Sequence, residues 1–320
     1  MQTATFAYTY FLPMLPQPDF AIIGAGKSGT TALHKYLQQH PQIFIPEHKD
    51  PSYLAVMQET PVAPEDDPQG FHHHPYAIYD EAAYLALFEP AGAEQLTGDV
   101  STMYLYHPDA AENIRRHRPG LKLICILRNP ADRLFSRYLH LARDRRDHET
   151  PLDQLFDRDS VWWHRDDLIR EGRFYEHLKR YYDRFGREQI KVFLYDDLKA
   201  DEQGLLRDIW DFLGVDASFT PETEIRFNQS GVIKHAWKDY LIGHPSLLRR
   251  SVEAVAPGIV DRMRKHPGLQ RMVSRMRAGN LERPDFDPAL RQRITDEIYR
   301  EDITKLQTLI GRDLSHWLGK

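Results

Sequence analysis

The residues best suited to chemistry lie in a glycine-rich stretch near the start of the chain, Gly24-Ala25-Gly26-Lys27-Ser28-Gly29-Thr30-Thr31. Its three glycines let the backbone turn tightly and present N–H groups to an anion. Lys27 adds a mobile positive charge, and Thr30 and Thr31 add hydroxyl donors. The helix expected after this stretch directs its positive end to the same point. These residue types in this order predict a binding site for phosphate or sulfate.

A second candidate site follows the apolar run 121–127, which predicts a buried strand. Arg128 stands at the carboxyl end of that run, where ligands bind in open α/β sheets. Ser136 follows about two turns into a helix expected from residue 130. A guanidinium fork and a hydroxyl together suit a phosphate group. Arg137 lies on the same helix, and we expect it to be solvated or paired with an acid.

Apolar runs and helix signals alternate along the rest of the chain, and they define the scaffold that must position both sites. Strands are expected at 20–23, 43–45, 121–127 and 190–195, and helices at 30–40, 80–88, 130–145, 173–185, 203–213 and through most of 287–318. Strands alternating with helices indicate an α/β fold with a central parallel sheet flanked by helices. We expect a single domain over 1–320, with residues 1–17 as an N-terminal extension.

The composition excludes several classes of protein. A net charge of −5 argues against a general nucleic-acid-binding surface, so we expect no nucleic-acid partner. The single cysteine cannot form an intrachain disulfide, which suits a reducing compartment. No apolar run approaches the roughly 20 residues of a membrane helix. The start of the chain lacks the pattern of a signal peptide. We therefore expect a soluble, cytoplasmic protein.

Two general nucleotide-binding patterns compete for the glycine-rich stretch. The P-loop pattern G-x-x-x-x-G-K-[ST] fits only its end, because the first glycine would fall on Ala21. The strand 121–127 also ends in Arg128 rather than in the acid that helps to hold Mg²⁺ in P-loop enzymes. The dinucleotide pattern G-x-G-x-x-G is met literally, and Glu47 follows the next expected strand, where an acid would bind the ribose. This second alternative remains open.

The two sites together resemble the sulfotransferase family. The stretch from Phe20 to Leu33 is similar to the 5′-phosphosulfate loop of that family, with its core K-x-G-T-T. The resemblance implies that Lys27 contacts the phosphosulfate and that the threonines bind the 5′-phosphate. The cofactor-binding residues carried over from this loop are Gly26, Lys27, Ser28, Gly29, Thr30 and Thr31. The segment Arg128-Asn129-Pro130 through Tyr138 resembles R-[ND]-P-x-x-R-x-x-S-x-Y, so Arg128 and Ser136 are implied to bind the 3′-phosphate.

The resemblance runs from about residue 18 to residue 318. Within the family, the sequence is most similar to the branch that contains heparan-type glycan sulfotransferases and many bacterial enzymes. This similarity is carried by the segments 40–53, 98–104, 172–178, 190–198, 212–215 and 311–317. It implies a P-loop-like sulfotransferase fold. It also implies 3′-phosphoadenosine 5′-phosphosulfate (PAPS) as the donor, 3′-phosphoadenosine 5′-phosphate (PAP) as the product, and no metal. The implied reaction is sulfuryl transfer to a hydroxyl or amine of an acceptor.

The catalytic residues implied by the resemblance are Lys27, Asp50 and Asp99. We expect Lys27 to stabilise charge on the leaving phosphate, with Ser28 restraining it before the acceptor binds. In the glycan branch a glutamate deprotonates the acceptor, and Asp50 occupies the matching position with a shorter side chain. Glu47 and His48 are neighbouring candidates for this base. Asp99 also replaces a glutamate, as base, acceptor contact or supporting residue.

Three further assignments follow from the resemblance or from local pattern. Tyr175 matches a position that faces the adenine, although its helical spacing equally fits a core tyrosine. Ser230 and Lys234 lie in a late loop that would close over the cofactor. The histidines at 72–74 do not suit a tetrahedral metal site, and we expect a surface loop there.

Two other functions remain as alternatives: an NAD- or flavin-dependent oxidoreductase and a catalytically inactive nucleotide-binding protein. The acceptor, whether a small molecule, a lipid or a glycan, is not predicted; we expect its pocket to be formed by variable loops at 47–80 and 146–170. The oligomeric state is likewise not predicted.

Overall fold

The computed structural model describes residues 17–63, 65–67, 74–143, 150–223, 232–233, 281–282 and 284–319. A five-stranded sheet, parallel throughout, forms its centre in the order β2-β3-β1-β4-β5. The strands are β1 (Phe20–Gly24), β2 (Ile43–Phe44), β3 (Leu96–Val100), β4 (Lys122–Leu127) and β5 (Ile190–Leu194). A two-stranded antiparallel ribbon is formed by β6 (Val232–Ile233) and β7 (Leu281–Glu282). The predicted α/β fold with a central parallel sheet is confirmed.

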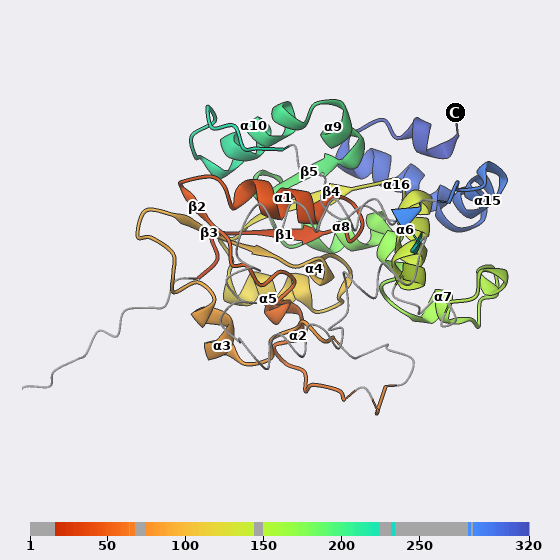
Figure 1. Ribbon diagram of the computed structural model, residues 1–320, viewed down its shortest axis with the longest axis horizontal. Coiled ribbons are helices and arrows are strands. Elements are labelled where there is room, and N and C mark those ends of the chain that lie inside the picture. Colours follow the sequence, from red (N-terminus) through yellow and green to blue (C-terminus); the bar gives the residue numbers. More distant parts are fainter. Residues whose placement is uncertain are drawn as a thin grey trace, which may run out of the picture.

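Helices cover both faces of the sheet (Figure 1). The α-helices are α1 (Thr30–Leu37), α2 (Tyr53–Val56), α3 (Glu81–Ala86), α4 (Met103–Tyr106), α5 (Ala110–His117), α6 (Pro130–Arg143), α7 (Val161–His164), α8 (Phe174–Tyr182), α9 (Tyr195–Ala200), α10 (Glu202–Leu213), α15 (Pro288–Ile294) and α16 (Arg300–Ile310). Short 3-10 turns are η2 (Leu152–Gln154), η3 (Arg170–Gly172), η4 (Arg187–Gln189) and η6 (Ser315–Leu318), and η5 (Thr295–Tyr299) is a π turn joining α15 to α16.

Alternating residues of the central strand feed two separate hydrophobic cores. Ala21 and Ile23 belong to the larger core, which includes residues of α2, α4, α5, α8 and α16. Phe20 and Ile22 belong to the smaller core, which is closed by α1 and α10. Figure 1 shows α1, α9 and α10 on one side of the sheet and α2, α4 and α5 on the other. Burial on both faces explains why β1 and β4 read as continuous apolar runs.

Strand β3 is the element of the sheet that the sequence analysis does not predict. Its centre is Thr97-Gly98-Asp99, which has neither the apolar run nor the alternation expected of a strand. Gly98 is required because a β-carbon there would lie 2.3 Å from the ring of Phe20 on the neighbouring strand β1. Close packing against an aromatic ring therefore selects a residue that weakens the strand pattern.

The strand order bears directly on the dinucleotide alternative. In the order 3-2-1-4-5-6 of that fold, the strand after the first helix lies beside β1. Here β3 lies beside β1, and β2 lies at the edge of the sheet. Glu47, which follows β2, has a largely exposed side chain that pairs with Lys35 (2.8 Å). The topology therefore contradicts the oxidoreductase interpretation of the glycine pattern.

Candidate active site

The glycine-rich stretch forms a loop between β1 and α1 at the carboxyl edge of the sheet. Gly29 caps α1 with a positive φ of 101°, and a β-carbon there would lie 3.0 Å from Leu198 and 3.2 Å from Tyr195. Lys27 also has a positive φ, of 64°. Ser28 is buried. The N–H groups in the first turn of α1 point out of the N-terminal end of the helix, toward the loop. The loop thus has the form of an anion cradle.

The side chain of Lys27 points into a buried, positively charged environment. Its Nζ lies 3.2 Å from Nδ1 of His140 on α6. Burial, followed by repulsion from Arg137 and Arg143, lowers the pKa of Lys27 to about 7. The carboxylate of Glu171 acts in the opposite direction and raises that pKa. An anion placed here would favour the protonated form of Lys27 and raise its pKa.

The second predicted site adjoins the first. Arg128 follows β4, its Nη1 donates to the main-chain carbonyl of Lys27 (3.2 Å), and its guanidinium lies 5.1 Å from the ring centroid of Tyr195. Ser136 is buried on α6, two turns after Arg128. The parallel order of β1 and β4 as neighbours explains this meeting, because both strands end at the same edge. Residues 101 positions apart are thus brought into direct contact.

Helix α6 carries two arginines that serve as structural partners. Arg137 pairs with Asp167, as the sequence analysis expects for this residue. Arg133 is fully buried, and its Nη1 lies 2.6 Å from Oε2 of Glu171. Both ion pairs join α6 to the segment around η3, so they fix the helix that presents Ser136 and His140.

Glu171 is a residue of this site that the sequence analysis does not identify. Its carboxylate accepts a hydrogen bond of 2.6 Å from the N–H of Gly26, in the loop itself. A β-carbon at Gly26 would lie 2.6 Å from Oε1 of Glu171, so a larger residue there would displace this carboxylate. A lone glutamate 145 positions from its partner offers no signal in the sequence.

Asp50 is connected to the loop by one intermediate residue, Thr102. Its Oδ1 accepts hydrogen bonds from the N–H (2.8 Å) and hydroxyl (3.1 Å) of Thr102, and its Oδ2 lies 2.5 Å from Nζ of Lys49. A β-carbon added at Gly24, at the start of the loop, would lie 3.4 Å from the carbonyl oxygen of Thr102. Asp50 is half-buried and is fixed in a strained conformation, with φ of 61°.

Asp99 occupies a different environment from Asp50, within the core. It accepts hydrogen bonds from the hydroxyls of Tyr84 (2.8 Å), Tyr104 (2.6 Å) and Ser101 (2.7 Å), and only 1% of the residue is exposed. Burial raises the pKa of Asp99, and the three hydroxyl donors oppose that shift. Its two oxygens are engaged by hydroxyls of the core, which favours the supporting role among the three roles expected for Asp99; its role stays a prediction.

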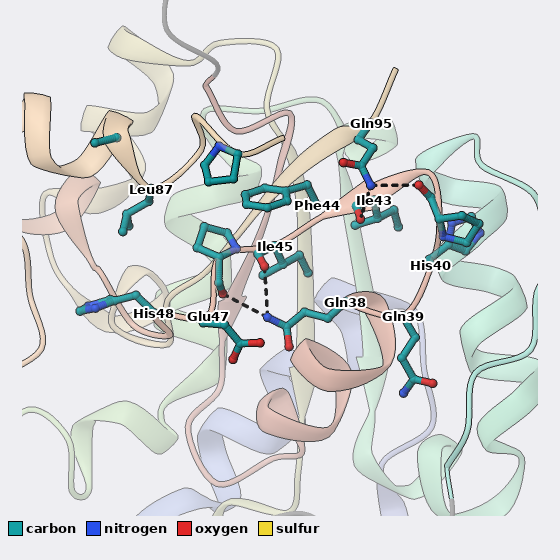
Figure 2. A pocket seen from close by; sticks show the side chains of 14 residues that line it. Gln38, Gln39, His40, Ile43, Phe44, Ile45, Glu47, His48, Leu87 and Gln95 are labelled. Carbon is teal, nitrogen blue, oxygen red and sulfur yellow. Dashed lines mark hydrogen bonds between the residues drawn. The ribbon is translucent and has the colours of Figure 1, made fainter. Parts of the chain in front are cut away.

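The other two base candidates lie on the surface beside β2. His48 Nε2 lies 2.9 Å from the carbonyl oxygen of Tyr76, and Glu47 pairs with Lys35. Both line an open cavity of about 690 Å³ along the edge strand, shown in Figure 2 with Phe44 and Gln38. This cavity contains no residue of the phosphate loop. Asp50 is thus the candidate base that the structure connects to the loop.

Tyr175 stands at the start of α8, against the C-terminal helix α16. Its N–H donates to the carboxylate of Asp302 (3.1 and 3.2 Å), and Nζ of Lys305 lies 5.8 Å from its ring centroid. The ring is partly buried against the larger core. These contacts agree with the core interpretation, and the contact with adenine stays a prediction.

Several other predicted features fall outside the site or outside the described residues. Ser230, Lys234 and the first two histidines of 72–74 lie outside the described residues. Among the residues that are described, no cluster of three or more His, Cys, Asp or Glu could hold a metal ion. Across the same residues, the helices are too short or too polar to cross a membrane.

Comparison with known proteins decides the family. The model of the sulfotransferase family matches residues 18–221, which contain the loop, Arg128, Ser136 and Glu171. The chain belongs to the sulfotransferase family. A solved sulfotransferase from Alicyclobacillus acidocaldarius is 30% identical and covers 94% of this chain and 99% of its own, with a TM-score of 0.64. Family and fold are those of sulfotransferase enzymes, so the enzyme class predicted from the two motifs is confirmed.

Curated relatives of this sulfotransferase include enzymes of glycan modification. A bifunctional heparan sulfate N-deacetylase/N-sulfotransferase 1 from Caenorhabditis elegans is 27% identical over 222 residues, 67% of this chain and 24% of the relative. The human bifunctional heparan sulfate N-deacetylase/N-sulfotransferase 2 is 23% identical over 94% of this chain and 31% of its own length. A membrane-associated sulfotransferase, kil1, from Dictyostelium discoideum is 28% identical over 45% of this chain and 27% of its own. The chain thus spans about a quarter to a third of these relatives.

Proposed function

We propose that this sulfotransferase transfers the sulfuryl group of PAPS to a hydroxyl or amine of an acceptor and releases PAP. The observation that carries the proposal is the contact between the two anion-binding elements, in which Nη1 of Arg128 donates to the carbonyl of Lys27. Two candidate phosphate sites in contact suit a nucleotide that carries anionic groups on its 3′ and 5′ oxygens.

The donor set of the site fits such a nucleotide. The N–H groups at the start of α1, with Thr30 and Thr31, would hold the 5′-phosphate. Arg128 and Ser136 would hold the 3′-phosphate. A β-carbon at Gly29 would press against Leu198 and Tyr195, and the residue's φ of 101° favours glycine, so the turn that begins α1 requires this residue. Bound there, PAPS would supply a sulfuryl group on a phosphate leaving group.

The residues of the chain supply charge, position and a base. The bond from sulfur to the bridging oxygen breaks as the acceptor oxygen or nitrogen bonds to sulfur. Lys27 stabilises the negative charge left on the phosphate, and it does so in a buried site where such interactions are strong. Asp50 accepts the proton that the acceptor loses: Thr102 fixes its Oδ1, and its Oδ2, which is paired with Lys49 (2.5 Å), takes the proton in exchange for that pair.

For the acceptor we propose a glycan amine or hydroxyl. Support comes from the relatives, whose names specify N-sulfation of heparan sulfate. A small-molecule or lipid alcohol is the alternative class, because acceptor pockets are formed by loops that vary among members of one fold.

The test is transfer of radiolabelled sulfate from PAPS to a panel of acceptors: an N-deacetylated glycan, its N-acetylated counterpart, a phenol and a long-chain alcohol. We expect label on the N-deacetylated glycan and none with Lys27→Ala. Label on a phenol or alcohol alone would overturn the glycan proposal. A protein that binds PAP yet labels no acceptor and releases no sulfate would support the inactive alternative.

A further inference from the structure

A buried carboxylate links the two nucleotide-binding elements from a third part of the chain. Glu171, in η3, directs Oε1 to the N–H of Gly26 and Oε2 to Nη1 of Arg133, at 2.6 Å each. Gly26 directly precedes Lys27 in the loop, and Arg133 lies on α6 between Arg128 and Ser136. One side chain thus fixes the spacing between the loop and the helix.

The surroundings make this link rigid. Arg133 is fully buried and also donates to the carbonyl oxygens of Asp167 (3.3 Å) and Leu168. Glu171 is 4% exposed, and a β-carbon at Gly26 would collide with its carboxylate. Hydrogen bonds from a main-chain N–H to a buried charge are strong and directional. Movement of Gly26 would therefore cost this bond and leave a buried charge incompletely paired.

We infer that Glu171 is a positioning residue of the reaction, which holds the loop at Gly26 so that Lys27 faces the transferred group. This inference rests on the proposed function, because it concerns the loop that binds the donor. The carboxylate also acts on Lys27 through space, since its negative charge keeps more of the lysine protonated at a given pH.

Two substitutions separate the hydrogen bond from the charge. Glu171→Gln removes the charge and places an amide donor against either Gly26 or Arg133. Glu171→Asp keeps a charge for Arg133, and withdraws the oxygen from Gly26 by about one methylene. The matched control is Asp197→Asn, because Asp197 likewise accepts from a main-chain N–H (Leu194, 3.1 Å) and an arginine (Arg312, 2.9 Å), outside the loop.

The experiment is calorimetric titration of each folded variant with PAP between pH 6 and pH 9, with a urea unfolding curve for each. We expect both Glu171 variants to bind PAP about tenfold or more weakly at pH 6.5. We expect the loss of affinity with rising pH to begin at lower pH in Glu171→Gln than in wild type. Asp197→Asn should match wild type in both respects. If Glu171→Gln does not fold, the tenfold loss is measured on Glu171→Asp.

Other results would overturn the inference. A folded Glu171 variant with wild-type affinity and pH dependence, even if less stable to urea, would make Glu171 a purely structural residue. An equal loss of PAP affinity in Asp197→Asn would mean that removing any carboxylate bonded to a main-chain N–H weakens binding. That result would also contradict a specific role for Glu171. Wild-type protein that binds no PAP at any pH would contradict the proposed donor itself, which is a different failure.

Discussion

Nζ of Lys27 lies 3.2 Å from Nδ1 of His140, and the same ring nitrogen lies 2.9 Å from Nη2 of Arg143. One ring nitrogen can accept from these two donors only when it carries no proton. Burial and the neighbouring cations, Lys27 first among them, lower the pKa of His140 far below its usual range, in agreement with this geometry. Lys27 is thus held by a neutral imidazole, on the helix that also carries Ser136.

The first prediction concerns the protonation of Lys27. Because burial lowers its pKa to about 7, most of the free protein carries a neutral Lys27 at pH 8. A bound anion favours the charged form and raises that pKa, so binding of PAP should take up as much as about one proton at pH 8. Affinity should fall as the pH rises above about 7. Calorimetry in buffers of different ionisation enthalpy measures this uptake.

The control for proton uptake is Lys27→Met, which fills similar space without a titratable group. It should bind PAP more weakly and take up no proton. Equal uptake by wild type and Lys27→Met would assign the proton to another group.

The second prediction separates the two aspartates. Asp50→Asn should lower turnover by about 10²- to 10⁴-fold, as expected for loss of a general base, while PAP affinity and urea stability change little. Asp99→Asn should destabilise the fold by about 1–3 kcal/mol, because one of its hydroxyl partners loses a buried acceptor. Turnover and urea unfolding are measured on both variants. The reverse pattern would exchange their roles.

A third prediction tests the close contact between β3 and β1. Gly98→Ala puts a β-carbon 2.3 Å from the ring of Phe20 and should cost about 1–3 kcal/mol of unfolding free energy. Gly120→Ala is the matched control, because a β-carbon there meets no atom within 4 Å. We expect its stability to be unchanged or slightly raised. Equal stability of the two variants, measured by urea unfolding, would contradict the packing of β3 described here.

The sequence predicts the site elements well where the chemistry is local. The loop from Gly24 to Thr31 and the segment from Arg128 to Ser136 each carry their hydrogen-bond donors within a few residues. Each follows an apolar run that predicts a buried strand. Their neighbouring position is seen only in the sheet, where β1 and β4 pair although two other strands separate them in the sequence.

Two features could not be predicted, for different physical reasons. Strand β3 is held by neighbours on both sides, and Gly98 satisfies a packing demand that depends on Phe20, far away in the sequence. Glu171 is defined only by its partners Gly26 and Arg133, and nothing adjacent to it in sequence marks it. Asp99 is the converse case. Its sequence motif suggested a catalytic role, whereas its burial and its three hydroxyl donors favour a supporting role. The compartment, the single-domain extent and the late-loop contacts of Ser230 and Lys234 stay predictions.

The donor is the central claim, and titration with PAP tests it most directly. Wild type, Arg128→Ala and the surface control Arg116→Ala are titrated with PAP, and NAD serves as the second ligand. We predict PAP binding by wild type and Arg116→Ala, with affinity lower by about 30- to 100-fold in Arg128→Ala, where a charged hydrogen-bond donor is lost. NAD should not bind measurably. Binding of NAD without PAP, or PAP binding that is unaffected by Arg128→Ala, would contradict the account.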